Sequence, residues 1–153
     1  MFLHTKLDER KDPIRVAFIG CGKFVSMFLS QYSHLNKIEI DSIVDLNIDQ
    51  AKKNCFRSGI TEEKISKINF SDSIDQILDR DIEIFIEATG NPIVGTVHAA
   101  KILKNKKHLI LVNVEADITC GKYLSDLSKK NGVICSMAYG DQHSLILEQI
   151  EWA

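Results

Sequence analysis

Two glycines, Gly20 and Gly22, constrain the fold more than any other feature of the sequence. They lie between the apolar run Ile14–Ile19, expected to form a buried strand, and an amphipathic stretch over 23–34, expected to form a helix. The first glycine permits a tight turn, and the second lets the backbone approach a pyrophosphate, whose charge then faces the positive end of the helix. The sequence therefore predicts the strand, turn and helix of a dinucleotide-binding domain.

Two further residues bear on this prediction. Val25 occupies the third position of G-x-G-x-x-G, so the glycine spacing alone is a weak signal. The stronger signal is Asp45, which ends the apolar run Ile38–Val44 and lies 23 residues beyond Gly22. An acidic side chain there can accept hydrogen bonds from an adenosine ribose. Two alternatives stay open: an ordinary strand–helix turn at the glycines, and a solvated strand end or helix cap at Asp45.

Apolar runs and amphipathic stretches alternate along the chain, which predicts an α/β fold. Strands are expected at 14–19, 38–44, 82–88, 108–114 and 133–138, and helices at 23–34, 48–57, 72–79, 93–105, 121–130 and 142–152. Strands separated by helices imply right-handed crossovers and a Rossmann-type doubly wound parallel sheet. We expect a polar arm over 1–13 and an NAD(P)-binding domain over 14–153. Because the last helix lacks a stop signal, the domain is expected to be incomplete at its C-terminus.

Composition narrows the class of function. The chain has 153 residues, a net charge of −2 and interspersed charges, which argues against a nucleic-acid or membrane surface. The sequence shows no signal-type apolar stretch and no run of membrane-spanning length. Cys21, Cys55, Cys120 and Cys135 form no C-x-x-C pair, which indicates reduced thiols in a cytoplasmic protein and no metal site.

The candidate cofactor-binding residues lie where strands end, since open parallel sheets bind ligands at the carboxyl ends of their strands. Asp45 would repel a 2′-phosphate and favour NAD(H), whereas Lys52 and Lys53 could offset that repulsion and admit NADP(H). Lys23 could equally be a solvated first-turn residue, and Asn91 could be a helix cap. The candidates are Gly20, Cys21, Gly22, Lys23, Phe24, Asp45, Thr89, Gly90, Asn91 and Asn113.

Asn113, Glu115 and Asp117 are the candidate catalytic residues. They are spaced by two, so an extended segment would place all three on one side. Carboxylates at the nicotinamide end of the sheet could bind substrate hydroxyls, a proton donor or a divalent metal. The alternative is that Asp117 caps the next helix and Glu115 is solvated. His98 falls within a predicted helix and is not expected to be a catalytic base.

Four segments, taken in order, resemble known oxidoreductases. Ile14–Phe24 resembles the opening of homoserine-dehydrogenase-like enzymes. Glu87–Pro92, Val112–Asp117 and Ala138–Gln142 resemble, more narrowly, the branch with a C-terminal SAF domain that includes deoxyxylulose-phosphate reductoisomerase-like enzymes. This resemblance implies an N-terminal Rossmann portion that binds NAD(P), with NADPH the cofactor in the reductoisomerase-like members. Val25 replaces the family's usual glycine, which would weaken phosphate binding, and family members are far longer, so no catalytic domain is expected here.

The sequence thus predicts the NAD(P)-binding portion of a homoserine-dehydrogenase-like oxidoreductase, which acts on a small hydroxy or carbonyl metabolite by hydride transfer. This portion is expected to bind cofactor without turning over substrate. The partner in the full-length family is a small-molecule substrate, not nucleic acid or a membrane, and homo-oligomerisation stays open. Two other classes also stay open: a non-catalytic nucleotide-binding regulatory module, and an S-adenosylmethionine-binding domain, which likewise uses a glycine turn and an acid after the second strand.

Overall fold

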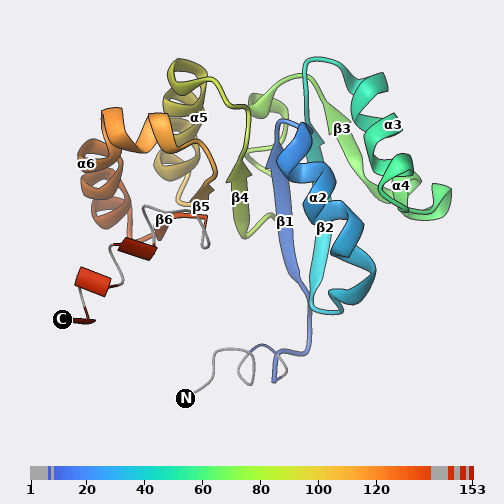
Figure 1. Cartoon of the computed structure of the whole chain (residues 1–153), viewed down its shortest axis with the longest axis horizontal. Helices are drawn as coiled ribbons and strands as arrows, with labels where there is room; N and C mark the ends of the chain where they lie inside the picture. The colour runs from blue at the N-terminus through green and yellow to red at the C-terminus, as the bar shows by residue number, and fades with distance from the viewer. Residues whose placement is uncertain (1–6, 8, 139–144, 147–148, 151) are drawn as a thin grey trace.

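Strands and helices alternate along the chain (Figure 1). The computed structural model describes residues 7, 9–138, 145–146, 149–150 and 152–153. Its elements are β1 (Ile14–Ile19), α2 (Lys23–Gln31), η1 (Tyr32–His34), β2 (Ile38–Val44), α3 (Ile48–Arg57), α4 (Glu62–Lys67), β3 (Asn69–Ser71), η2 (Ile74–Gln76), β4 (Ile84–Glu87), α5 (Pro92–Lys104), β5 (His108–Leu111), α6 (Val114–Asn131) and β6 (Cys135–Met137).

The strands form one parallel sheet in the order β3-β2-β1-β4-β5-β6. This is the strand order of dinucleotide-binding Rossmann sheets, and the predicted fold class is confirmed. The chain moves outward from β1 to β3 and then crosses back to β4, so the loops after β1 and β4 diverge at the switch point. In such sheets the crevice at the carboxyl ends of these strands is where ligands bind.

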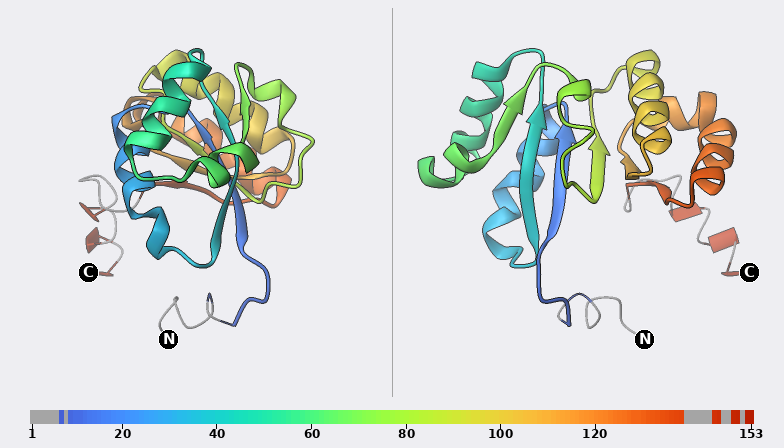
Figure 2. Two further views of the ribbon diagram at one scale, coloured as in Figure 1. Left: turned by 90° about the vertical axis from the view of Figure 1, so that its right-hand side faces the viewer. Right: turned by 180° about the vertical axis from the view of Figure 1, so that it is seen from behind.

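Helices lie on both faces of the sheet (Figure 2), and an apolar layer of buried side chains lies on each face. Val16 and Phe18 pack towards α2 and α3, whereas Ala17 and Ile19 pack towards α5 and α6. Burial on both faces explains why β1 is a continuous apolar run rather than an alternating one. Val25, at the third position of the glycine pattern, is fully buried in the layer under α2. A buried side chain at this position therefore packs α2 onto the sheet.

Several predicted elements are wrong. The short edge strand β3 and the helix α4 were not expected, and the helix expected at 72–79 is only the single 3-10 turn η2. The strand expected at 108–114 ends at Leu111, and α6 begins at Val114 instead of residue 121, because the Asn113 side chain accepts a hydrogen bond from the amide of Ala116 and caps the helix. Most of the helix expected at 142–152, and most of the arm at 1–13, lie outside the described residues.

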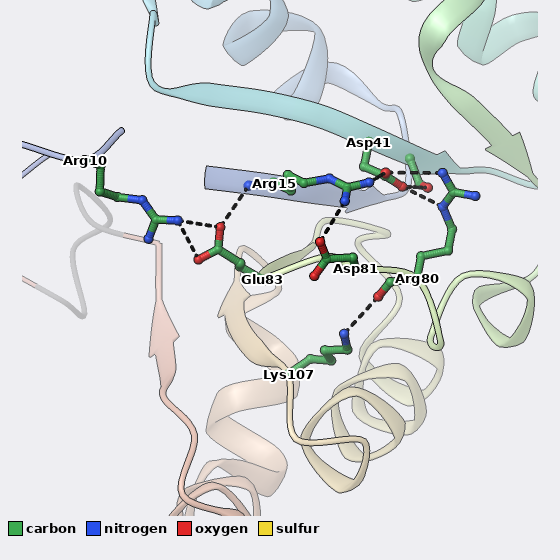
Figure 3. Close-up of polar contacts among 8 residues, drawn as sticks. Arg10, Arg15, Asp41, Arg80, Asp81, Glu83 and Lys107 are labelled. Carbon is green, nitrogen blue, oxygen red and sulfur yellow. Dashed lines mark hydrogen bonds and ion pairs between the residues drawn. The ribbon is translucent and has the colours of Figure 1, made fainter. Parts of the chain in front are cut away.

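An ion-pair network centred on the buried carboxylate of Asp41 joins the β1–β2 pair to the segment before β4 (Figure 3). Asp41 is an extra residue of β2, at a bulge opposite Val16 and Ala17, and its side chain is only 4% exposed. Its carboxylate accepts hydrogen bonds from Arg15 and, at 2.7 Å, from the Nε of Arg80. Burial by itself would raise the pKa of Asp41, but hydrogen bonds from its partners outweigh burial and lower the pKa to about 2.

None of the helices in the described part of the chain combines the length and the apolar character needed to cross a membrane.

Candidate nucleotide site

A cavity of about 520 Å³ opens at the carboxyl ends of β1, β2 and β4. Its walls come from the turns after β1 and β4, the loops after β2 and β3, and the first three turns of α5. Leu46 lines it on one side and Val94 and Val97 on the other, and all three side chains are exposed. A cavity of this size, with apolar walls and a few polar groups, suits a ligand the size of a nucleoside.

The turn after β1 has the backbone that the two glycines predict. Gly20 has a φ of +87°, and a Cβ there would lie 2.9 Å from the carbonyl oxygen of Ala88, the residue that directly follows β4, so the position requires glycine. Gly22 is the N-cap of α2, and no atom lies within 4 Å of the place a Cβ would take. The first turn of α2, where Lys23 and Phe24 are exposed, contains no acidic residue and therefore leaves its amides available to an anion.

Asp45 joins this turn to the loop after β2. Its Oδ2 accepts a hydrogen bond from the amide of Cys21 at 2.8 Å, and its Oδ1 accepts one from the amide of Asn47 at 2.9 Å. The carboxylate is therefore held in place without a ligand. Each oxygen retains capacity for a further hydrogen bond, and Asp45 lines the cavity, so it can still accept from a ribose hydroxyl.

Cys21 contributes to the site differently from its neighbours. Its side chain is buried in the core and its Sγ lies 3.8 Å from the carbonyl oxygen of Ala51. A hydrogen bond with Cys55, together with burial, raises the pKa of the Cys21 thiol. The amide of Cys21 is occupied by Asp45, and its carbonyl accepts a hydrogen bond from Asn54. Cys21 therefore holds the turn in shape, and the sulfur faces away from the cavity.

Lys52 and Lys53 do not line this cavity. The Nζ of Lys52 lies 5.5 Å from the centre of the Phe70 ring, and both lysines border shallow hollows beside α3 and α4. Lys101 does line the cavity, but its Nζ donates to both carboxylate oxygens of Asp75 at 2.7 Å. The structure therefore gives no support to the hypothesis that Lys52 and Lys53 offset the charge of Asp45.

The sequence of the turn between β4 and α5 suggested either a helix cap or a cofactor-binding position, and the structure is compatible with both. The Asn91 side chain accepts from the amides of Ile93 and Val94 at 3.1 Å and so caps α5, which begins at Pro92. Asn91 and Thr89 also line the cavity, and Gly90 has a φ of +70°. Capping and a place at the rim of a binding site are thus compatible here.

A buried polar cluster of Glu87, His98 and Asn113 lies directly behind this turn. Of its members, the sequence pointed to Asn113 alone as a site residue. Glu87 at the end of β4 is fully buried, and its Oε1 accepts hydrogen bonds from the amide and the hydroxyl of Thr89. Within the described residues, the Oε2 of Glu87, the Nδ1 of His98 and the Nδ2 of Asn113 are buried without a hydrogen-bond partner. A Cβ on Gly95 would come within 2.8 Å of Glu87 and 2.6 Å of Asn113. The sequence did contain a signal for this cluster: Glu87 is a charged residue at the end of an apolar run, and Gly95, which faces it, is a glycine in the middle of the next helix.

Asn113, Glu115 and Asp117 do not form the extended segment we expected. Asn113 is the N-cap of α6, and the two acids lie in its first turn, where successive positions spaced by two point in different directions. Their charges complement the helix dipole, and Glu115 is exposed. None of the three lines the cavity, so their catalytic role remains a prediction. In the part of the chain that the structure describes, no group of three or more His, Cys, Asp or Glu side chains is placed to hold a metal ion.

The strand order, the glycine turn and the acid at the end of β2 define a nucleotide-binding Rossmann domain. Residues 14–139 match the model of the Gfo/Idh/MocA oxidoreductase family, whose members have an NAD-binding Rossmann fold. The match spans most of the chain, and the chain belongs to this family.

Solved structures share the fold. The yvaA protein of Bacillus subtilis is 19% identical, with a TM-score of 0.69, and the match covers 94% of this chain and 40% of that one. Homoserine dehydrogenase of S. aureus is 23% identical, with a TM-score of 0.58 and coverages of 84% and 32%. Homoserine dehydrogenase of Thiobacillus denitrificans is 16% identical, with a TM-score of 0.67 and coverages of 82% and 29%. The chain therefore spans less than half the length of these proteins.

The chain is also similar in sequence to kinases. Shikimate kinases of two Staphylococcus epidermidis strains are 26% identical over 120 residues, which cover 77% of this chain and 67% of theirs. A kinase phosphate loop has four residues between its glycines and a serine or threonine after Gly-Lys, whose hydroxyl binds magnesium. Here one residue separates the glycines, and Phe24 follows Lys23. The phosphate-loop chemistry of a kinase therefore has no counterpart in this turn.

Proposed function

We propose that the chain is the NAD-binding portion of an oxidoreductase that transfers hydride between the nicotinamide and a small hydroxy or carbonyl metabolite. In this proposal the cavity receives the adenosine, Asp45 accepts hydrogen bonds from the ribose, and the pyrophosphate faces Gly22 and the first turn of α2. The observation that carries it is the position of a fixed, cavity-lining carboxylate beside an open glycine turn at the switch point of the sheet.

The environment of Asp45 supports NAD(H) over NADP(H). A 2′-phosphate on the adenosine ribose would lie against this carboxylate, which two backbone amides hold in place. Neutralising that repulsion would require a cation, but Lys101 is paired with Asp75, and Lys52 and Lys53 border other hollows. We therefore expect the chain to bind NADH more tightly than NADPH, unlike the reductoisomerase-like members that it resembles.

The substrate and the narrower branch are inferred from sequence. Glu87–Pro92 and Val112–Asp117 support a place in the homoserine-dehydrogenase-like branch whose members carry an SAF domain. Hydride transfer requires nicotinamide and substrate to be held in near contact and shielded from water. In the proposed placement the cavity receives only the adenosine part of the cofactor, so we expect these residues to bind cofactor and not to turn over substrate by themselves.

Titration with NADH and NADPH, followed by nicotinamide fluorescence, tests the proposal. Gly22→Leu fills open space where the pyrophosphate would lie, so the fold is expected to persist while binding is lost. Gln31→Leu adds the same side chain at the exposed C-terminal end of α2 and serves as the matched control. We expect saturable NADH binding in the wild type and the control, with NADPH at least about tenfold weaker. Unaltered binding by Gly22→Leu, or no binding of either cofactor by the wild type, would contradict the proposal.

A further inference from the structure

His98 connects the cavity to the buried carboxylate of Glu87. It lies one helical turn after Val94 on α5, and both side chains line the cavity. The Nδ1 of His98 is buried and lies 3.7 Å from the Oε1 of Glu87. Within the described part of the chain its Nε2 makes no hydrogen bond and is not among the buried unpaired atoms, so the accessible part of this ring includes Nε2.

Glu87 determines which hydrogen-bonding group this ring presents. Its carboxylate is fully buried at the end of β4, and Thr89 donates two hydrogen bonds to the oxygen that faces His98. A neutral imidazole carries one proton, and a carboxylate beside Nδ1 favours the tautomer with the proton on that nitrogen. The Nε2 then has a free lone pair and acts as an acceptor.

The other acidic groups around the cavity already have partners. The Asp75 carboxylate accepts from Lys101, the Asp72 carboxylate accepts from Gln76 at 3.3 Å, and Asp45 accepts from two backbone amides. Among the described side chains that line the cavity, the acceptors with no hydrogen-bond partner include the Nε2 of His98 and the Oδ2 of Asp72. The apolar side chains of Leu46, Val94 and Val97 flank the same space and can contact the faces of a planar base.

We propose that His98 recognises the adenine base of the cofactor: its Nε2 accepts a hydrogen bond from the exocyclic amino group, and Glu87 acts as the positioning residue that holds the ring in the accepting tautomer. The inference rests on the proposed function, because it requires the adenosine to occupy the cavity. It adds a specificity that the ribose and pyrophosphate contacts do not provide. A base that carries an oxygen in place of the amino group would oppose two acceptors and bind more weakly.

The test compares NADH with the reduced form of nicotinamide hypoxanthine dinucleotide, in which a keto oxygen replaces the amino group. Both are followed by nicotinamide fluorescence, and the ratio of their dissociation constants is the readout. We expect the wild type to bind NADH about tenfold more tightly. His98→Asn places an amide near the position of Nδ1, where it faces Glu87 as that nitrogen does, and removes Nε2. The ratio should then fall to within about twofold.

Two further variants make the test specific. His34→Asn changes an exposed histidine outside the cavity and should leave the ratio unchanged. Glu87→Gln leaves His98 in place but removes the charge that favours the accepting tautomer, so the ratio should fall as well. A purely structural role of Glu87 would lower stability, or weaken both ligands equally, without moving the ratio. This variant also provides a test that does not depend on the folding of His98→Asn.

The outcomes separate the two proposals. If NADH does not bind at all, the proposed function fails and the inference fails with it. If NADH binds but the wild type holds both dinucleotides within twofold, the cofactor site stands and the role of His98 is overturned. If folded His98→Asn keeps the tenfold ratio, the role of His98 in recognising the base is overturned. If Glu87→Gln keeps it, the role of Glu87 as the positioning residue is overturned.

Discussion

Replacing Asp41 by asparagine tests quantitatively the ion-pair network that Figure 3 shows around this buried carboxylate. The pKa of Asp41 is lowered to about 2 in the folded chain, against about 3.9 for an ordinary aspartate. A folded-state pKa below the unfolded value contributes stability that is present above about pH 4 and is lost as the pH falls towards 2. The difference corresponds to about 2 kcal/mol of unfolding free energy at pH 7. Asp41→Asn removes this contribution and leaves Arg15 and Arg80 without their shared partner.

Urea unfolding followed by far-ultraviolet circular dichroism, between pH 7 and pH 2.5, measures the effect. The wild type should exceed Asp41→Asn by about 2 kcal/mol or more at pH 7, and about half of the pH-dependent part should be gone by pH 3. Glu63→Gln is the control, because Glu63 pairs with Lys67 on the surface and its removal should have little effect. A difference between wild type and Asp41→Asn that stays constant over this pH range would refute the reasoning.

Three other substitutions test the turn, the cofactor preference and the packing of α2. Gly20→Ala should destabilise the chain by about 1–3 kcal/mol, measured by urea unfolding, because φ is +87° and the new Cβ would meet Ala88 at 2.9 Å. Asp45→Ala should reduce the preference for NADH over NADPH to within about threefold in fluorescence titrations, since the repulsive carboxylate is gone. Val25→Gly should restore the glycine pattern yet lower the thermal midpoint, with a loss of about 2–4 kcal/mol, because Val25 is fully buried. Unchanged stability in Val25→Gly would show that the side chain is dispensable.

Much of the nucleotide site could be predicted because its information is local in sequence. Gly20 must adopt a backbone that only glycine adopts readily, and Asp45 follows an apolar run that ends where the strand ends. The bounds of β1 and β2 were predicted without error, since long apolar runs bounded by charged or glycine residues define buried strands. Because Gly20 and Asp45 each follow directly after a predicted strand, the sequence was sufficient to place both at the same edge of a parallel sheet.

Elements that are very short, or whose local sequence pattern suggests a different structure, could not be predicted in the same way. The strand β3 has three residues, too few for a periodic pattern, and gains its structure by pairing with β2. Asn113 follows an apolar run that reads as a continuing strand, yet its side chain caps a helix. For this reason Glu115 and Asp117 lie in a helix, and the prediction of an extended segment was wrong.

The sequence by itself determined the α/β class, the glycine turn and the acid that follows the second strand, because each depends on residues that are neighbours along the chain. Only the tertiary structure decided which distant side chains meet. Arg80 reaches Asp41 from 39 positions away, and Glu87, His98 and Asn113 converge from a strand, a helix and a helix cap. Such contacts depend on strand order, on a bulge in β2 and on the space beside Gly95, and the periodicity of a sequence specifies none of these.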